Sequence, residues 1–181
     1  AINEIFGKLV GTSLALGQGA SAGDYSIALG NDASAGVSSV VLGSYASAGN
    51  YSVTLGRVAS AAGDYSVALG YDASAAGDYS VALGSIASAV SSSVALGRTA
   101  SATRIYSTAL GYNASAAGSS SVALGYDASA ENDNEGILGG TGSSQTSTWK
   151  VPGSFTVSGT KNFEIPHPKP EKKATHVIRH G

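Results

Sequence analysis

The sequence predicts an all-β fold, a parallel β-solenoid of short stacked coils followed by a small β-rich C-terminal region. Three observations support this fold. A Leu-Gly pair recurs every 13 or 14 residues, an Ala-Ser-Ala triplet recurs in phase with it, and Gly stands twice in many units, as in Gly63 and Gly70. So short a period cannot hold a helix with a partner strand, and an isolated pair of short strands has no stability of its own. Each unit is therefore predicted to be one coil of a stack.

The repeats divide the chain into three predicted parts. Residues 1–13 form an N-terminal lead-in, residues 14–139 form the solenoid, and residues 140–181 form the C-terminal region. Because parallel strands lie about 4.8 Å apart, ten coils predict a rod of roughly 50 Å.

Each coil is predicted to read strand, corner, strand, corner. Val67 and Leu69 stand two apart, which is strand alternation and predicts that both side chains point into the coil, facing Ala73 and Ala75 of the opposite wall. The extra residue of the longer units falls in the second corner, as residues 61–63 against 35–36 show. The predicted core repeat consists of Leu29, Leu42, Leu55, Leu69, Leu83, Leu96, Leu110 and Leu124.

So thin a tube buries little apolar surface against the entropy of ordering the chain. The alternation predicts a column of small outward residues, which would let another chain approach closely. A homotrimer is expected to supply the missing core. The column consists of Ala68, Ala82, Ala95, Ala109 and Ala123.

The repeats weaken after Ala130, and Leu138-Gly139 is the last of the Leu-Gly pairs. Beyond a polar stretch, apolar residues separated by Pro152-Gly153 and Gly159 predict short strands and turns around a small aromatic cluster. The cluster would contain Trp149, Val151, Phe155, Val157, Phe163 and Ile165.

The repeat Ser-Val-Ala-Leu-Gly-x-x-Ala-Ser-Ala, which extends from about Leu14 to Leu138, resembles the YadA-like head repeats of trimeric autotransporter adhesins. The resemblance implies a left-handed parallel β-roll, three chains side by side, and binding to host cells or extracellular matrix. The neck, coiled-coil stalk and membrane anchor that follow the head in that family are not found in this sequence.

A second, shorter resemblance lies near the C-terminus. Gly159-Thr-Lys-Asn-Phe-Glu-Ile-Pro-His-Pro168 is similar to a segment of tail-fibre proteins that often precedes a self-cleaving chaperone domain. It implies a fibre of a phage or another virus-like particle, with a chain that continued beyond Gly181 before cleavage or truncation.

The amino-acid composition limits the kinds of partner that the chain is expected to bind. Charged residues make up 12% of the chain and the net charge is −2, so no basic field is present to gather nucleic acid. No apolar run has the roughly 18 to 20 residues of a membrane helix, so no direct membrane insertion is expected. With no Cys, the chain has neither a disulfide nor a thiolate metal site.

Tyrosines recur at two repeat positions and are the candidate surface-contact residues. Their rings are suited to contact with protein or carbohydrate, while packing between coils and chains is the simpler interpretation. The first position holds Tyr25, Tyr51, Tyr65, Tyr79 and Tyr106, and the second holds Tyr71, Tyr112 and Tyr126.

Carboxylates also recur, before Tyr in Gly-Asp-Tyr and just after the Leu-Gly pair. They are compatible with short Ca²⁺-binding ladders, although turn capping by Asp is favoured because several coils substitute Ser, Asn or Val. The two sets are Asp24, Asp64 and Asp78, and Asp32, Asp72 and Asp127.

Histidines occur only at 167, 176 and 180. His176 and His180 have the spacing of two ligands on one helical face, but no carboxylate ligand motif accompanies them, so a solvated or inter-subunit tail is favoured. No Gly-x-Ser-x-Gly elbow with a His and Asp partner set stands out. The sequence therefore predicts no metal, no cofactor and no catalytic residue.

The expected function is a non-enzymatic trimeric fibre for attachment to a host or surface. It would be extracellular, on a virion tail or a bacterial surface, and its partners would be a second and third copy of itself and a host-cell surface protein, matrix or glycan. Three alternatives stand beside it: a polysaccharide-degrading enzyme of the tail-spike type, which needs paired carboxylates in a groove, a purely structural spacer, and an ice-binding solenoid, for which the threonines are too scattered.

Overall fold

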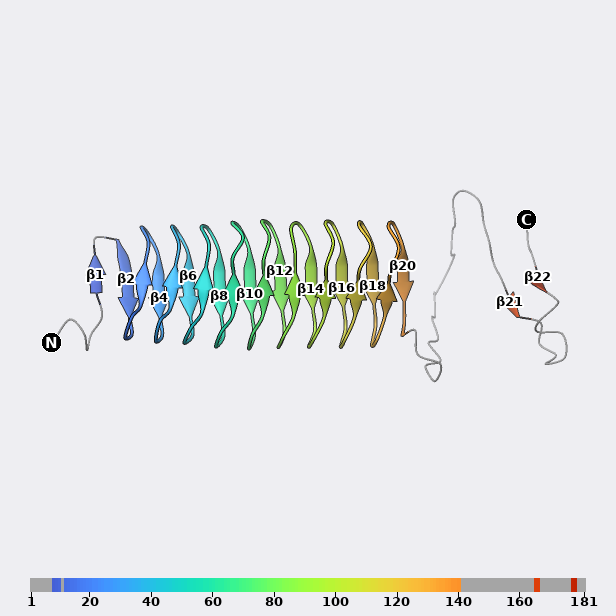
Figure 1. The fold of residues 1–181 in the computed structure, drawn as a ribbon, viewed down its shortest axis with the longest axis horizontal. Helices are drawn as coiled ribbons and strands as arrows, with labels where there is room; N and C mark the ends of the chain where they lie inside the picture. The colour runs from blue at the N-terminus through green and yellow to red at the C-terminus, as the bar shows by residue number, and fades with distance from the viewer. Residues whose placement is uncertain (1–7, 11, 141–164, 167–176, 179–181) are drawn as a thin grey trace, which may run out of the picture. The chain divides into compact units, whose positions relative to one another are not determined.

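The computed structural model describes residues 8–10, 12–140, 165–166 and 177–178. By its contacts the chain divides into residues 1–147 and 148–181, which are described separately. In the first unit, strand and corner alternate along a regular stack of coils (Figure 1). The predicted all-β parallel solenoid is confirmed.

Two sheets form the walls of the stack. Sheet A has eleven strands in the order β1-β2-β4-β6-β8-β10-β12-β14-β16-β18-β20, and sheet B has nine, in the order β19-β17-β15-β13-β11-β9-β7-β5-β3. The strands of sheet A are β1 (Lys8–Val10), β2 (Ser13–Leu16), β4 (Ile27–Leu29), β6 (Val40–Leu42), β8 (Val53–Leu55), β10 (Val67–Leu69), β12 (Val81–Leu83), β14 (Val94–Leu96), β16 (Thr108–Leu110), β18 (Val122–Leu124) and β20 (Gly136–Leu138). Those of sheet B are β3 (Ser21–Ala22), β5 (Ser34–Ala35), β7 (Ser47–Ala48), β9 (Ser60–Ala61), β11 (Ser74–Ala75), β13 (Ser88–Ala89), β15 (Ser101–Ala102), β17 (Ser115–Ala116) and β19 (Ser129–Ala130).

Successive coils stack in register. Leu69 pairs with Leu83, and Leu83 pairs with Leu96, although one of these coils is a residue longer than the other. In sheet B, Ser74 pairs with Ser88. The additional residue lies in the second corner, which we define as the turn from a sheet B strand to the next sheet A strand, as the sequence predicts. The strands therefore keep their facing while the period varies.

The interior of the coil consists of small side chains. Ala68, Ala73 and Ala75 are fully or almost fully buried, and so is Ser66. In β10 the pattern is half-buried, buried, half-buried, so Val67 and Leu69 lie on the outside and Ala68 lies on the inside. The predicted burial of Ala73 and Ala75 is confirmed.

The predicted facing of the sheet A strands is wrong. The alanines expected on the outside are buried. The leucines expected in the core repeat are half-buried or exposed, and these are Leu29, Leu42, Leu55, Leu69, Leu83, Leu96, Leu110 and Leu124. The physical reason is width, because two walls joined by corners this short leave room for little more than facing methyl groups. Val41 and Thr54 are the larger residues found buried at the Ala68 position.

A buried serine stabilises most second corners. Ser66 Oγ donates to the carbonyl of Gly63 at 2.6 Å, and Ser80 Oγ donates to that of Gly77 at 2.6 Å. Each bond satisfies both the buried hydroxyl and a turn carbonyl. Among the described residues, no buried side-chain nitrogen or oxygen lacks a partner.

Each complete coil turns sharply at both corners. Tyr65 in a second corner and Asp72 in a first corner, the turn from sheet A to sheet B, have φ of 57° and 54°. This left-handed region is uncommon for residues other than Gly, Asn and Asp, and β-branched Val58 occupies it with φ of 62°. The repeated stack of backbone hydrogen bonds holds these residues in place, as in the bond from Val58 N to Ser44 O at 3.0 Å.

The two ends of the stack differ from its middle. At the N-terminal end β1 pairs antiparallel with β2 and covers the edge of sheet A. At the other end β19 is the edge of sheet B, and among the described residues no further strand accepts the corner N–H groups. Glu135, at the repeat position of the buried serines, accepts them instead, from Glu131 N at 2.7 Å and Asn132 N at 2.9 Å.

We expect Glu135→Gln to loosen the last coil. The hydrogen bonds from the backbone of Asn132 and then Glu131 hold the pKa of the Glu135 carboxyl below its usual value. Because the folded pKa is lowered, this stabilisation is complete above the unfolded pKa and is lost as the pH falls through the folded pKa. In Glu135→Gln, hydrogen exchange at Glu131 and Asn132 should be roughly three- to tenfold faster at neutral pH.

Glu131→Gln is the matched control for this prediction, because its carboxylate accepts no backbone N–H among the described residues. Its exchange rates should stay close to those of the parent chain. Equal exchange in Glu135→Gln and the parent at neutral pH would show that Glu135 does not cap the stack.

In the second unit the structure describes one antiparallel pair, β21 (Ile165–Pro166) with β22 (Val177–Ile178). The rest of the predicted aromatic cluster and the three histidines lie outside the described residues. The division at 13/14 and 139/140 and the aromatic cluster remain predictions.

Candidate binding surfaces

An apolar face covers the outside of sheet A. Its side chains are large and aliphatic, they recur in two columns, and several are more than one third exposed, such as Leu55 at 47% and Val53 at 41%. We call these residues the Val/Leu face: Ile27, Leu29, Val40, Leu42, Val53, Leu55, Val67, Leu69, Val81, Leu83, Val94, Leu96, Leu110, Val122 and Leu124. Large continuous apolar patches are rare on monomers and mark interaction sites.

The outside of sheet B is polar by contrast. A serine occupies the outward position of each strand in this sheet, as Ser74 and Ser88 do, and Ser34 and Ser47 are exposed. The two outer faces of one coil thus differ sharply in polarity, which assigns different roles to them.

The predicted surface tyrosines of the second corner are all exposed, from 51% for Tyr51 and Tyr65 to 70% for Tyr25. Tyr51 and Tyr65 stack with ring centroids 4.8 Å apart, and Tyr65 stacks on Tyr79 at 5.2 Å. The interior of this ladder therefore has its ring faces covered. Packing between coils, one of the two sequence interpretations, accounts for these three rings.

Two of the tyrosines stand apart from the ladder. Ser38 occupies the position between Tyr25 and Tyr51, and Ser92 and Ser120 occupy the positions on either side of Tyr106. Tyr25 and Tyr106 are 70% and 63% exposed, and neither stacks on another ring among the described residues. Their ring faces are open, so they are the better candidates for contact with a partner.

The first corner carries a second set of aromatic contacts. Tyr112 stacks on Tyr126 at 5.2 Å, and the guanidinium groups of Arg57 and Arg98 lie over Tyr71 and Tyr112 at 5.6 and 5.4 Å. The ring stacking and the two cation–π contacts thus give these tyrosines and both arginines partners within the stack of coils.

The recurring carboxylates act on the backbone. Asp64 Oδ1 accepts the N–H of Asn50 at 3.0 Å, and Asp78 Oδ1 accepts the N–H of Asp64 at 2.9 Å. This geometry agrees with turn capping, the favoured interpretation of Asp64 and Asp78. Within residues 12–140 no group of three or more His, Asp or Glu is arranged to hold a metal ion.

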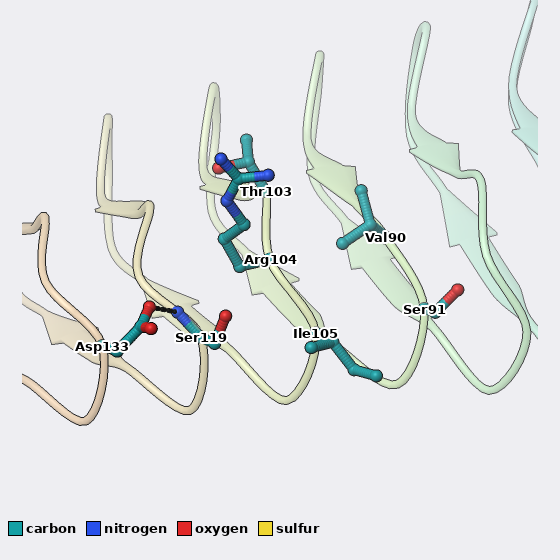
Figure 2. Close-up of a pocket in the computed structure, with 7 residues that line it drawn as sticks. All are labelled: Val90, Ser91, Thr103, Arg104, Ile105, Ser119 and Asp133. Atoms are coloured by element: carbon teal, nitrogen blue, oxygen red, sulfur yellow. Dashed lines mark hydrogen bonds between the residues drawn. The ribbon is translucent and has the colours of Figure 1, made fainter.

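A groove of about 670 Å³ lies along four consecutive second corners (Figure 2). Its polar side chains include Ser91, Thr103, Arg104 and Asp133, and Ile105 adds an exposed apolar surface. These side chains come from successive coils, and the only hydrogen bond drawn among them joins Ser119 N to Asp133 Oδ1 at 2.7 Å. Sequence reasoning did not find this groove.

None of the described residues forms a helix long and apolar enough to cross a membrane. The fold and its surfaces define the class: a repeat-built β-roll with one apolar and one polar outer face.

The repeats match a known family model. Residues 12–33, 61–85, 91–114 and 116–134 match the family model described as YadA head domain repeat (2 copies). Over these residues the chain is similar to that repeat, in agreement with the sequence resemblance. No curated protein sequence matches the chain significantly.

Among solved structures, the collagen-binding domain of the Yersinia adhesin YadA has the same fold. It is 27% identical to this chain, the match covers 76% of this chain and 78% of that domain, and the TM-score is 0.66. Together the two comparisons support a trimeric adhesin head for host attachment, and neither favours the polysaccharide-cleaving alternative.

Proposed function

We propose that the chain is a non-enzymatic homotrimeric attachment head in which three rods associate through the Val/Leu face. The single observation that carries this proposal is the inverted facing of the sheet A strands, which leaves the largest aliphatic side chains outside the coil. An exposed column of this length needs a cover.

Closed symmetry explains why copies of the same chain provide that cover. The Val/Leu face repeats at every coil, so a second rod in the same register meets an identical column along its whole length, and a three-fold arrangement surrounds the axis with no open edge. Leu69 and Val81 would then lie in a shared core that a single coil is too thin to contain. The predicted Ala68 column cannot serve as this interface, because Ala68 is fully buried within its own coil.

The remaining surface is available for the partner. The serine face of sheet B lies on the opposite wall of the coil from the Val/Leu face, and the tyrosines of the second corner are exposed, Tyr25 and Tyr106 without a stacked ring among the described residues. By analogy with the collagen-binding YadA domain, we assign a host matrix protein as the first ligand class, with other host-surface proteins or glycans as alternatives. The proposed location is extracellular, on a bacterial surface.

A virion tail is the second candidate location. The likeness of residues 159–168 to tail-fibre proteins supports it, and the same trimeric rod would serve there as spacer and attachment head.

The test measures the molar mass of the assembly and its binding to matrix. Light scattering on the purified chain should give the mass of three 17.7 kDa copies, and the protein should bind immobilised fibrillar collagen or a matrix extract in a saturable manner, with an unrelated trimeric β-solenoid as control. A monomer at micromolar concentration would refute the trimer, and a trimer that binds no matrix protein, host cell or surface glycan would refute the attachment role. Release of sugars from surface polysaccharide would support the alternative function of a polysaccharide-cleaving enzyme.

A further inference from the structure

In the middle of the stack, the chain fills its own second corners with side-chain oxygens. Asn50 Oδ1 accepts the N–H of Val37, Asp64 Oδ1 that of Asn50, and Asp78 Oδ1 that of Asp64, at 3.0, 3.0 and 2.9 Å. Each acceptor stands one coil beyond its donor. The corner N–H group is thus a site into which an aspartate carboxylate fits, as the chain itself demonstrates.

The next corners lack this acceptor. Ser91, Ile105 and Ser119 stand where Asp64 and Asp78 stand in their coils, and the sequence departs from Gly-Asp-Tyr at all three. Among the described residues, the N–H groups of Ser91 and Ile105 have no acceptor, whereas Ser119 N again bonds to Asp133 Oδ1 at 2.7 Å. The groove of Figure 2 lies along this gap.

Arg104 places a cation in the same groove. Its side chain is exposed, and within residues 12–140 no carboxylate lies at ion-pair distance from its guanidinium. The arginines of the first corner differ, because Arg57 and Arg98 each lie over a tyrosine ring. Arg104 and the open backbone N–H groups of Ser91 and Ile105 thus line one groove, and each of them favours a carboxylate partner.

The groove also matches what surrounds a carboxylate in a polypeptide. Ser91 and Thr103 offer hydroxyls for the backbone of an extended segment, and Ile105, at 44% exposed, offers an apolar surface. Every lining residue belongs to a second corner and none to a strand of sheet A. The groove therefore lies off the Val/Leu face.

We propose that this groove binds an Asp or Glu side chain from an extended segment of a protein partner, through Arg104 and the N–H groups of Ser91 and Ile105. The inference rests on the proposed attachment function and specifies one contact within it. A protein segment is favoured over an acidic sugar because the chain's own aspartates occupy the equivalent corners.

A peptide copied from the chain tests the proposal. The probe is Ala-Gly-Asp-Tyr-Ser, the sequence of residues 76–80, blocked at both ends and fluorescently labelled. The fluorescence anisotropy of the labelled peptide is measured while the trimer of the 181-residue chain is titrated into it. We expect saturable binding that weakens at least about tenfold when Ala replaces Asp in the peptide, or when the protein carries Arg104→Gln. Arg98→Gln, a change of the same kind in the first corner, should leave the affinity unchanged.

A second variant refills the gap. Ile105→Asp places a carboxylate one coil beyond Ser91, as Asp78 stands one coil beyond Asp64, so it should occupy Ser91 N–H. We expect this variant to lose peptide binding and to melt at a higher temperature than the parent. Reduced binding with unchanged or higher stability cannot result from misfolding.

Several outcomes would overturn the proposal. These are no binding to the parent trimer, equal affinity for the Asp and Ala peptides, and unchanged affinity in both Arg104→Gln and Ile105→Asp. Binding of sialyllactose that depends on Arg104, without peptide binding, would make the ligand a glycan instead. Molar mass and matrix binding are measured on the same samples. If the protein is trimeric and binds matrix but does not bind the peptide, the groove assignment alone is wrong. If the parent protein is not trimeric or does not bind matrix, the proposed function fails whether or not the peptide binds.

Discussion

Leu83→Asp is expected to convert the trimer into monomers. Leu83 is half-buried in the single rod and lies in the middle of the Val/Leu face, with Leu69 and Leu96 as its paired neighbours. Three-fold packing of this face would bring three carboxylates into an apolar core, where an unpaired charge costs several kcal/mol. Association should weaken by at least about 100-fold, which follows from a loss of roughly 3 kcal/mol.

The measurement is molar mass by light scattering across a dilution series. Ser88→Asp is the matched control, because it adds the same charge to the outward position of sheet B in the same coil, and it should remain trimeric. A Leu83→Asp chain with the mass and melting temperature of the parent would show that the Val/Leu face is not the interface.

Gly84→Ala is expected to destabilise the rod strongly, although it adds only a single methyl group. Gly84 follows β12 with φ of +137°, a region that side chains other than Gly rarely adopt. A Cβ there would lie 2.3 Å from the carbonyl oxygen of Gly97 in the next coil. That neighbour is backbone in the middle of a hydrogen-bonded stack, so neither side can move freely.

The expected loss is about 3 kcal/mol of unfolding free energy, at the upper end of the cost of one strained residue. It corresponds to a fall of roughly 6 to 12 °C in Tm, measured by circular dichroism. Ser85→Ala is the control, since it removes one hydroxyl from the same corner and should change stability by less than about 0.5 kcal/mol. A Gly84→Ala chain as stable as this control would mean that the corner is far softer than its geometry indicates.

The sequence was sufficient to predict the coil because period, Gly placement and strand alternation all constrain the backbone. The parallel register, the two strands per coil and the site of the extra residue follow from the recurrence of Leu-Gly and Ala-Ser-Ala. Alternation also fixes that Val67 and Leu69 share one side and Ala68 takes the other. It does not fix which side is inside.

That choice depends on the distance between the walls, which no single strand encodes. The assumption that larger residues are buried fails when the interior is narrower than a leucine. A signal was nevertheless present, because Ala68, Ala73, Ala75 and Ser66 recur as small residues in unit after unit, whereas the Val67 position admits Ile27 and Thr108. Small size in most units, rather than hydrophobicity, marks the interior of a tube this thin.

The binding surfaces were predicted only in part. Exposure of Tyr25 and Tyr106 follows from their corner positions, but the stacking of Tyr51, Tyr65 and Tyr79 depends on the spacing of coils. The groove was missed because its signal is an absence, the loss of the Gly-Asp-Tyr aspartate at Ser91, Ile105 and Ser119. In a repeat protein, a run of departures from the consensus is itself informative.

The stacking of coils also determines how the rod carries mechanical load. The hydrogen bonds between coils run along the rod, as in the bond from Gly84 N to Leu69 O at 2.8 Å. Tension along the axis therefore pulls on them directly, one coil interface at a time, and the chain peels from an end instead of shearing. Resistance to flow then depends on the two terminal structures, the antiparallel β1 and the Glu135 carboxylate, and on lateral contact between rods.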